Sequence, residues 1–152
     1  MRAIPDGPDC PEDPILWSRL GAIARSQERI RIATPYFVPD PAMITALCVA
    51  ALNGATVEIL MPAKSNLRFV EWASNGVLVQ LLERGCKVFK SSLPFDHMKL
   101  MIVDDDWAQV GSANWDARSF RLNFEFDLAL RSHPAIAELA GEADQKGELN
   151  AL

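Results

Sequence analysis

The sequence predicts a layered α/β domain with a mixed β-sheet. Segments with the alternation of strands and segments with the periodicity of helices follow one another along most of the chain. Two apolar runs are then joined by Asp104, Asp105 and Asp106, a turn signal that indicates a hairpin. Strand–helix–strand units give parallel neighbours and a hairpin gives antiparallel ones, so we expect both kinds of pairing in one sheet.

Two of the expected helices begin with the pair Asp-Pro. Asp13 and Asp40 are expected to cap these helices, which would span residues 15–27 and 42–53. The remaining elements follow from apolar periodicity and from Gly and Pro at their ends. They are strands at 29–34, 55–61, 86–90, 107–110 and 125–130, and helices at 67–84 and 135–143.

Length, charge and cysteine spacing restrict the function. The 152 residues suit one domain with its own core. The net charge of −5 leaves no basic surface, so we expect no nucleic-acid partner and no simple electrostatic docking to anionic lipid. The three cysteines lie far apart and have neither metal-binding nor disulfide spacing: Cys10, Cys48 and Cys86. We expect no metal and no cofactor.

The ends of the chain differ in composition from its middle. Residues 1–13 are rich in Pro, Gly and Asp and are predicted to be a linker. The domain is predicted at 14–143, and a polar tail at 144–152. No apolar run reaches the length of a transmembrane helix, and no signal peptide is recognisable after Met1.

The stretch 96–125 holds the residues with the most distinctive chemistry. In a strand, His97 and Lys99 would share one face, and Leu100 and its alternate neighbours would enter the core on the other. The return strand would carry Ser112 and Asn114 back alongside them. A histidine, an ammonium, a hydroxyl and an amide would then surround one small polar pocket.

This set of groups suits displacement at phosphorus. A neutral imidazole of His97 can attack, or its protonated form can protonate a leaving oxygen. Lys99, Ser112 and Asn114 would hold the non-bridging phosphate oxygens. A carboxylate such as Glu125 would bond the far ring nitrogen of His97 and fix its tautomer.

Other residues leave two interpretations open. Asp104 either caps backbone at the strand end or takes part in the chemistry. Tyr36 and Phe37 follow a strand end, where they either line an acyl or glycerol pocket or pack the loop. His133 precedes Pro134 at a helix start and has no following lysine, so it is predicted to be a surface residue.

The motif His97-x-Lys99-x-x-x-x-Asp104, followed by Gly111-Ser112-x-Asn114, resembles the HKD signature of the phospholipase D superfamily. The sequence segments 33–39 and 111–125 are similar to segments in the C-terminal half of bacterial cardiolipin synthases. The resemblance implies an α-β-α layered fold. It also implies that Glu125 orients the histidine.

The resemblance further implies a site built from two His-x-Lys sets that face each other across a two-fold axis. One histidine forms a phosphohistidine, and the other protonates the leaving alcohol. This sequence contains one such set. We therefore expect a second half-site, either from another copy of the chain or from a missing N-terminal half.

Three hypotheses follow. The first is a cardiolipin synthase-like phosphatidyltransferase half that converts two phosphatidylglycerol molecules into cardiolipin and glycerol. The second is a homodimeric phosphodiesterase, and the third is an inactive truncated half. For the first, the expected place is the bacterial cytoplasmic membrane, peripherally bound; otherwise the chain would be cytoplasmic.

Overall fold

The computed structural model describes residues 1–63, 68–91, 97–116 and 122–147. The strands are β1 (Arg2–Asp6), β2 (Arg29–Ala33), β3 (Phe37–Val38), β4 (Thr56–Pro62), β5 (Lys87–Ser91), β6 (Leu100–Val103), β7 (Trp107–Gly111), β8 (Trp115–Asp116) and β9 (Glu125–Arg131). The helices are α1 (Pro14–Arg25), α2 (Pro41–Leu52), α3 (Arg68–Glu83) and α5 (Ala135–Gly147).

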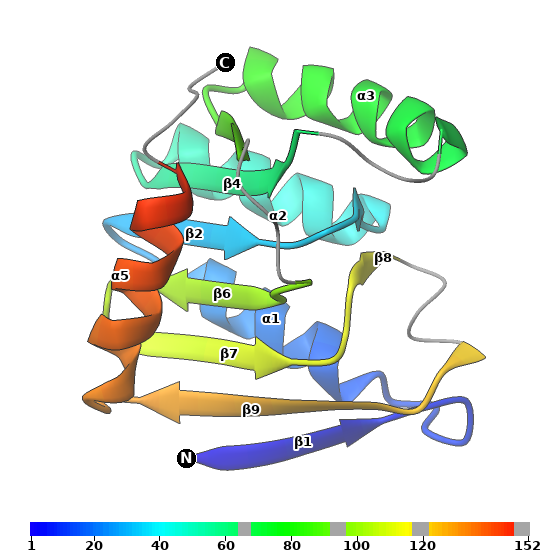
Figure 1. Ribbon diagram of the computed structural model, residues 1–152, viewed down its shortest axis with the longest axis vertical. Helices are drawn as coiled ribbons and strands as arrows, with labels where there is room; N and C mark the ends of the chain where they lie inside the picture. The colour runs from blue at the N-terminus through cyan, green and yellow to red at the C-terminus, as the bar shows by residue number, and fades with distance from the viewer. Residues whose placement is uncertain (64–67, 92–96, 117–121, 148–152) are drawn as a thin grey trace.

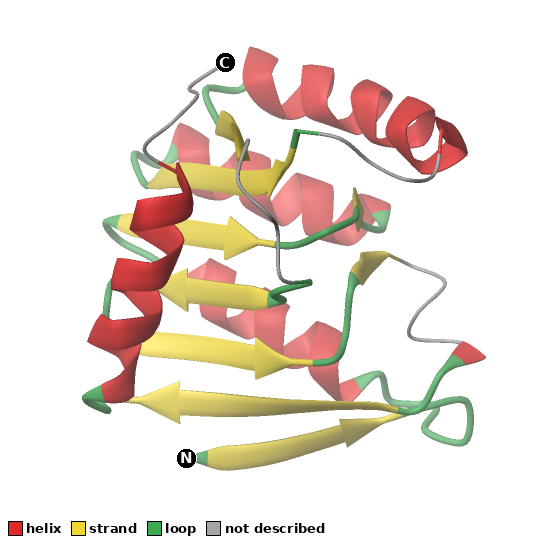
Figure 2. Ribbon diagram, in the orientation of Figure 1, coloured by secondary structure: helices red, strands yellow, loops and turns green. Residues whose placement is uncertain are grey.

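A seven-stranded sheet forms the middle layer, in the order β1-β9-β7-β6-β2-β4-β5 (Figure 1). Strands β2, β4 and β5 are parallel, and β6, β7, β9 and β1 continue the sheet antiparallel from β2. Helix α5 crosses the front of the sheet, and α1 and α2 lie behind it (Figure 2). The predicted α-β-α layers and the mixed sheet are confirmed.

Alternation along the strands divides the core between the two faces of the sheet. In β6, Met101 and Val103 join the cluster that packs beneath α1, α2 and α3. Leu100 and Ile102 join the opposite cluster, which packs against α5. Because successive side chains of a strand point to opposite faces, one apolar strand supplies both cores.

The two predicted helix caps have different outcomes. Asp40 accepts a hydrogen bond from the Met43 backbone N–H at 2.9 Å, as expected of an N-cap. Asp13 occupies the predicted N-cap position, but its φ is 43° and its side chain makes no capping bond. Instead Asp6, at the end of β1, accepts from the Ile15 N–H at 3.1 Å, so an element distant in sequence caps α1.

The predicted domain boundaries are wrong at both ends. Residues 2–6, predicted to be linker, form β1, which pairs with β9 along its whole length. The helix predicted to end at residue 143 runs to Gly147, and Asp144 within it forms an ion pair with Arg31 at 2.8 Å. A local composition rich in Pro and Asp could not reveal that β9 offers β1 a partner.

A second, two-stranded sheet was not predicted. It pairs β3 with β8 in parallel, and Phe37 lies opposite Trp115. In the part of the chain that the structure describes, no helix is long and apolar enough to cross a membrane.

Asp104 anchors the start of β2 to the end of β6. Its carboxylate accepts hydrogen bonds from the backbone N–H groups of Gln27, Glu28 and Arg29, each at 2.9 Å. Burial tends to raise the pKa of this carboxyl, but the three backbone bonds outweigh it and lower the pKa below its usual value. Of the two interpretations of Asp104, these contacts support the structural one.

The Asp104→Asn variant tests this anchor. It should lower the free energy of unfolding at pH 7 by about 2 kcal/mol, because the amide has one acceptor oxygen and its NH2 group cannot accept from the backbone N–H that the second carboxylate oxygen binds. A carboxyl whose folded pKa is depressed stabilises the protein above its unfolded pKa of about 3.9, and that stabilisation is lost as the pH falls through the folded pKa. Denaturant titration should therefore show the two proteins converging below about pH 4.

The exposed Asp9→Asn substitution serves as the matched control and should leave stability unchanged at every pH. An Asp104→Asn protein as stable as the wild type at pH 7, or a difference that persists undiminished in acid, would contradict the anchor.

Candidate active site

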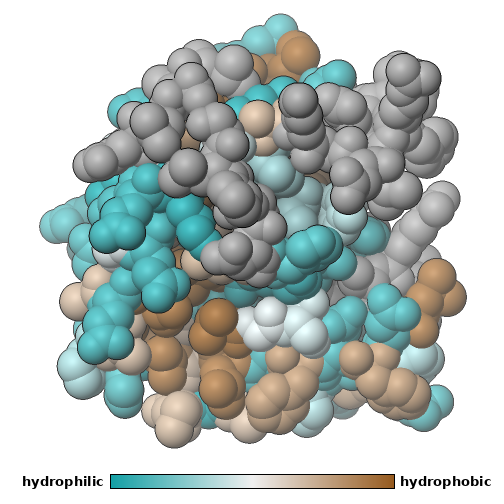
Figure 3. Space-filling view, viewed as in Figure 1, coloured by the Kyte–Doolittle hydropathy of each residue, from teal (hydrophilic) through white to brown (hydrophobic). Residues whose placement is uncertain are grey.

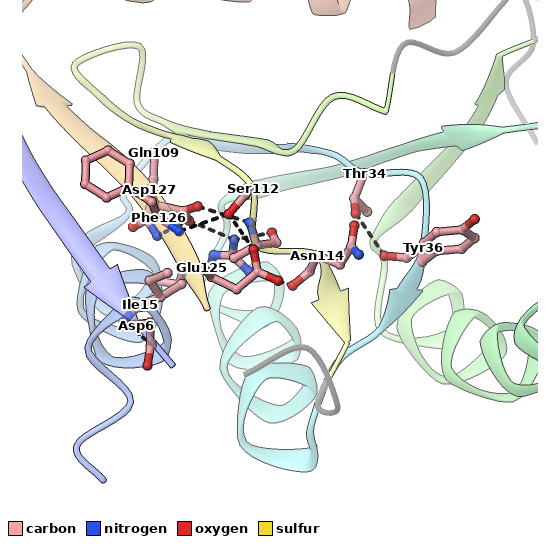
Figure 4. Close-up of polar contacts among 12 residues, drawn as sticks. Asp6, Ile15, Thr34, Tyr36, Gln109, Ser112, Asn114, Glu125, Phe126 and Asp127 are labelled. Carbon is pink, nitrogen blue, oxygen red and sulfur yellow. Dashed lines mark hydrogen bonds and ion pairs between the residues drawn. The ribbon is translucent and has the colours of Figure 1, made fainter. Parts of the chain in front are cut away.

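Ends of the four strands β2, β6, β7 and β9 lie on one side of the main sheet. The antiparallel register pairs Leu100 with Val110 and Gly111 with Asp127, so β6 and β9 begin where β7 ends. Strand β2 ends at the same side, because Ala33 lies opposite Leu100. The segments that carry His97, Lys99, Ser112, Asn114 and Glu125 therefore converge, although they belong to different connections (Figure 1). Figure 4 shows Ser112, Asn114 and Glu125 at this side of the sheet.

His97 does not lie in a strand as predicted. Strand β6 begins at Leu100, and His97 has a φ of 49°, in the left-handed region that non-glycine residues rarely adopt. Its side chain is exposed, and its ring stands edge-on to Tyr36 with 6.3 Å between the ring centroids. Lys99 still lies beside it, because the Lys99 Nζ donates to the His97 carbonyl oxygen at 2.6 Å.

Lys99 is a partly buried cation near two carboxylates. Burial lowers the pKa of its ammonium, and the charges of Glu125 and Asp127 oppose that shift. The two acids therefore help to keep Lys99 protonated, the state in which it can bind a phosphate oxygen.

Glu125 is buried and bonds Ser112 rather than His97. The Ser112 hydroxyl donates to Glu125 Oε2 and accepts from the Phe126 backbone N–H at 2.9 Å. The Ser112 N–H in turn donates to the Phe126 carbonyl at 3.1 Å. The predicted bond between Glu125 and the His97 ring is not among the contacts of these two residues, so here the acid fixes the serine.

Asn114 lies between Glu125 and Thr34 (Figure 4). Its side-chain Oδ1 is buried and has no hydrogen-bond partner among the described residues. A buried amide without a complete set of partners can accept new hydrogen bonds from a bound molecule. The structure thus brings Asn114 to the same edge as Ser112, as predicted.

The two aromatic candidates, Tyr36 and Phe37, differ in their burial and in their contacts. Phe37 is fully buried and stacks on Trp115, with ring centroids 5.8 Å apart, so it packs the loop and cannot line a substrate pocket. Tyr36 is half-buried next to His97, and its backbone carbonyl accepts from the Thr34 hydroxyl at 2.8 Å. Asp104 lies at the opposite end of β6 and is not brought together with His97.

A buried polar cluster beneath the site was missed from the sequence. Asp127 accepts from Arg19 Nη2 at 3.1 Å, from Gln109 Nε2 at 2.8 Å and from the Ala113 N–H at 3.2 Å. Arg19 also donates to the backbone carbonyls of Ala113 and Asn114, at 2.8 and 3.3 Å. Burial lowers the pKa of Arg19, and the Asp127 charge and hydrogen bond oppose that shift.

Two sequence signals point to this cluster. Arg19 lies inside the apolar stripe of α1, beside Leu16, Leu20 and Ile23, where a charged side chain needs a buried partner. Asp127 lies two residues after Glu125, so in a strand both point to one face. Gly111 belongs to the same arrangement, because a side chain there would collide with Asp127 Oδ1 and the Phe126 carbonyl.

Similar proteins share this sequence pattern. Residues 20–146 match the family described as "Cardiolipin synthase, PLD-like domain". Cardiolipin synthase 2 of Bacillus cereus is 41% identical over 139 residues, 91% of this chain and 27% of the relative. A cardiolipin synthase of a Geobacillus species is 43% identical over 142 residues, 93% of this chain and 28% of the relative. The chain thus spans little more than a quarter of the length of these relatives.

Solved structures share the fold at lower identity. The phospholipase D family member Nuc of Salmonella typhimurium has a TM-score of 0.81 at 23% identity, covering 99% of this chain and 96% of that one. Phosphatidylserine synthase of Haemophilus influenzae has a TM-score of 0.75 at 17% identity, covering 99% of this chain and 40% of that one. Together with the family match over most of its length, this fold shows that the chain belongs to the phospholipase D-like domain family of the cardiolipin synthases.

Proposed function

We propose that this chain supplies one half-site of a two-histidine phosphatidyltransferase that makes cardiolipin and glycerol from two molecules of phosphatidylglycerol. The observation that carries the proposal is the convergence of His97, Lys99, Ser112 and Asn114 at one side of the sheet. The names of the relatives supply the substrate class. Among the described residues, the other histidine, His133, has no lysine next to it or two residues away in the sequence.

The reaction requires two imidazoles. In the first step a histidine nitrogen attacks phosphorus, a P–N bond forms, and the P–O bond to glycerol breaks as a second histidine gives its proton to the leaving oxygen. In the second step that histidine takes a proton from the hydroxyl of another phosphatidylglycerol, whose oxygen forms a P–O bond as the P–N bond breaks and the first histidine is released. One imidazole cannot be neutral nucleophile and protonated acid at once, so His97 needs a counterpart.

By analogy with the C-terminal half of the resembled enzymes, we assign His97 the role of the acid and base. Its ring is exposed at the sheet edge, where it can reach a phosphorus held by a facing half-site. The left-handed turn directs the His97 carbonyl at Lys99 and leaves the imidazole free of protein hydrogen bonds among the described residues. The imidazole nitrogens therefore remain available for proton transfer.

The other groups at this edge would bind the phosphate and its charge. Lys99 supplies a cation, and the Asn114 side-chain amide supplies N–H donors for non-bridging oxygens; the Ser112 hydroxyl would have to turn from Glu125 to donate to them as well. Glu125 holds the Ser112 hydroxyl in place. Orientation of His97 by Glu125 would require a new hydrogen bond between the imidazole and the carboxylate when substrate binds.

The second half-site is proposed to come from another copy of the chain or from a preceding half. Apolar atoms gather over β9 and β1 on the face shown in Figure 3, and next to Glu125 the side chain of Phe126 is 51% exposed. Such a surface beside an incomplete site suits a protein partner. We place the assembled enzyme peripherally at the bacterial cytoplasmic membrane, where its phospholipid substrate lies.

A homodimeric phosphodiesterase is the second candidate, and the single His-x-Lys set favours it. The two candidates differ in the acceptor: a lipid hydroxyl gives cardiolipin, whereas water gives phosphatidic acid. Product analysis by mass spectrometry after incubation with phosphatidylglycerol separates them.

The His97→Ala variant tests the catalytic assignment. Cardiolipin formation by the assembled enzyme should fall by a factor of about 1,000 or more, because proton transfer by the histidine is lost. The melting temperature should hardly change, since the side chain is exposed.

His133→Ala is the matched control. His133 is exposed at the start of α5, where its ring nitrogen accepts from the Ala135 N–H at 3.2 Å, so its loss should leave the rate unchanged. Equal activity of the His97→Ala and His133→Ala proteins would contradict the assignment of His97.

A further inference from the structure

The segment Gly111–Asn114, here called the phosphate loop, takes its backbone geometry from buried charged groups beneath it. Ala113 lies at its centre and is fully buried. Its N–H donates to Asp127 Oδ1 at 3.2 Å, and its carbonyl accepts from Arg19 Nη2 at 2.8 Å. The backbone N–H and the carbonyl of Ala113 are therefore both bound by the ion pair of Asp127 and Arg19.

Arg19 contacts the loop at a second point. Its Nη1 donates to the Asn114 carbonyl at 3.3 Å, and its Nη2 also bonds Asp127 Oδ2 at 3.1 Å. The planar guanidinium thus spans two successive carbonyls and a carboxylate in a fixed geometry, which a lysine ammonium cannot reproduce. The two residues that carry the phosphate-binding side chains, Ser112 and Asn114, directly flank the Ala113 backbone that the pair holds.

The same guanidinium connects the loop to the other side of the site. It lies 4.6 Å from the centroid of the Trp115 ring, which stacks on Phe37. Phe37 follows Tyr36, whose ring stands edge-on to His97. A single buried cation therefore contacts both the phosphate loop and the small sheet that supports Tyr36.

Stability alone is a poor reason for these charges. Removing two charges from water is unfavourable, and apolar residues of similar volume often stabilise such a position equally well. A network whose hydrogen bonds are directed at one loop instead gives that loop a unique geometry. The hydrogen bonds of Arg19 and Asp127 to Ala113 and Asn114 are of this kind.

We propose that Arg19 and Asp127 are positioning residues: by clamping both polar groups of Ala113 and the Asn114 carbonyl, they set where Ser112 and Asn114 meet a phosphate. This role rests on the proposed function of the site. Neither residue contacts the reacting atoms in this scheme. Their effect passes through the backbone of the phosphate loop.

The test uses the whole chain labelled with ¹⁵N, inorganic phosphate as the probe, and the Arg19→Lys variant, which keeps the charge. Hydrogen exchange of the Ala113 amide reports the clamp directly. Shifts of the Ser112 and Asn114 amide signals during a phosphate titration report binding. In Arg19→Lys we expect faster exchange at Ala113 and a phosphate Kd weaker by roughly tenfold, the effect of losing one charge-assisted bond.

Arg31→Lys is the matched control. Arg31 is also a buried arginine in an ion pair, with Asp105 and Asp144, but these partners lie outside the phosphate loop. It should lower the melting temperature while leaving Ala113 exchange and phosphate affinity as in the wild type. An Arg19→Lys protein that behaves like Arg31→Lys in both measurements would overturn the positioning role.

Asp127→Asn provides a second variant should Arg19→Lys fail to fold. Its amide oxygen can still accept from Ala113, but the ion pair with Arg19 is lost, so exchange at Ala113 should become faster, and wild-type exchange would refute the proposal. Its phosphate affinity does not report the clamp, because the Asp127 charge also favours protonated Lys99. The two readouts also separate the claims. A wild-type chain that gives no phosphate shifts contradicts the proposed function, whereas unchanged Ala113 exchange in both variants contradicts the clamp.

Discussion

The antiparallel register of β6, β7 and β9 is the constraint on which the site depends. It brings the start of β6, the end of β7 and the start of β9 to one side of the sheet. The backbone hydrogen bonds of these central strands are made independently of the chemistry, so the sheet is a rigid base for the loops that carry it. A shift of one residue in this register would turn Glu125 and Asp127 to the opposite face.

Several charged side chains lie buried or partly buried near this edge of the sheet, where loss of contact with water disfavours their charged forms. Lys99, Glu125, Arg19 and Asp127 are all partly or fully removed from water, and each is tolerated because an opposite charge or a directed hydrogen bond compensates it. The imidazole of His97, by contrast, is exposed. Under the proposed function this one histidine would act together with a second one from a facing half-site.

Much of the fold was predictable because it follows from local pattern. Alternating apolar residues predicted strands such as β2, and the Asp40-Pro41 pair predicted the start of α2. Strand β1 and the capping of α1 by Asp6 were not predictable, since both depend on partners distant in sequence. For the same reason the composition of residues 1–13 indicated a linker, although part of this segment forms the edge strand β1.

The candidate site divides in the same way. His97, Lys99, Ser112 and Asn114 were found from their spacing, whereas the left-handed turn at His97 and the bond between Glu125 and Ser112 depend on three-dimensional packing. Arg19 lies 108 residues from Asp127 in sequence, so no local pattern joins them. For Asp104 the sequence left a structural and a chemical role open, and its bonds to three backbone N–H groups support the structural one.

Under the proposed function, one His97 half-site cannot complete phosphatidyl transfer alone. The most direct measurement is the rate of cardiolipin formation from phosphatidylglycerol in detergent micelles, made at chain concentrations on both sides of the self-association seen by analytical ultracentrifugation. We expect no cardiolipin from monomeric chain, and turnover only where a second His-x-Lys set is present. A monomer, free of any second set, that forms cardiolipin at a constant rate would contradict it.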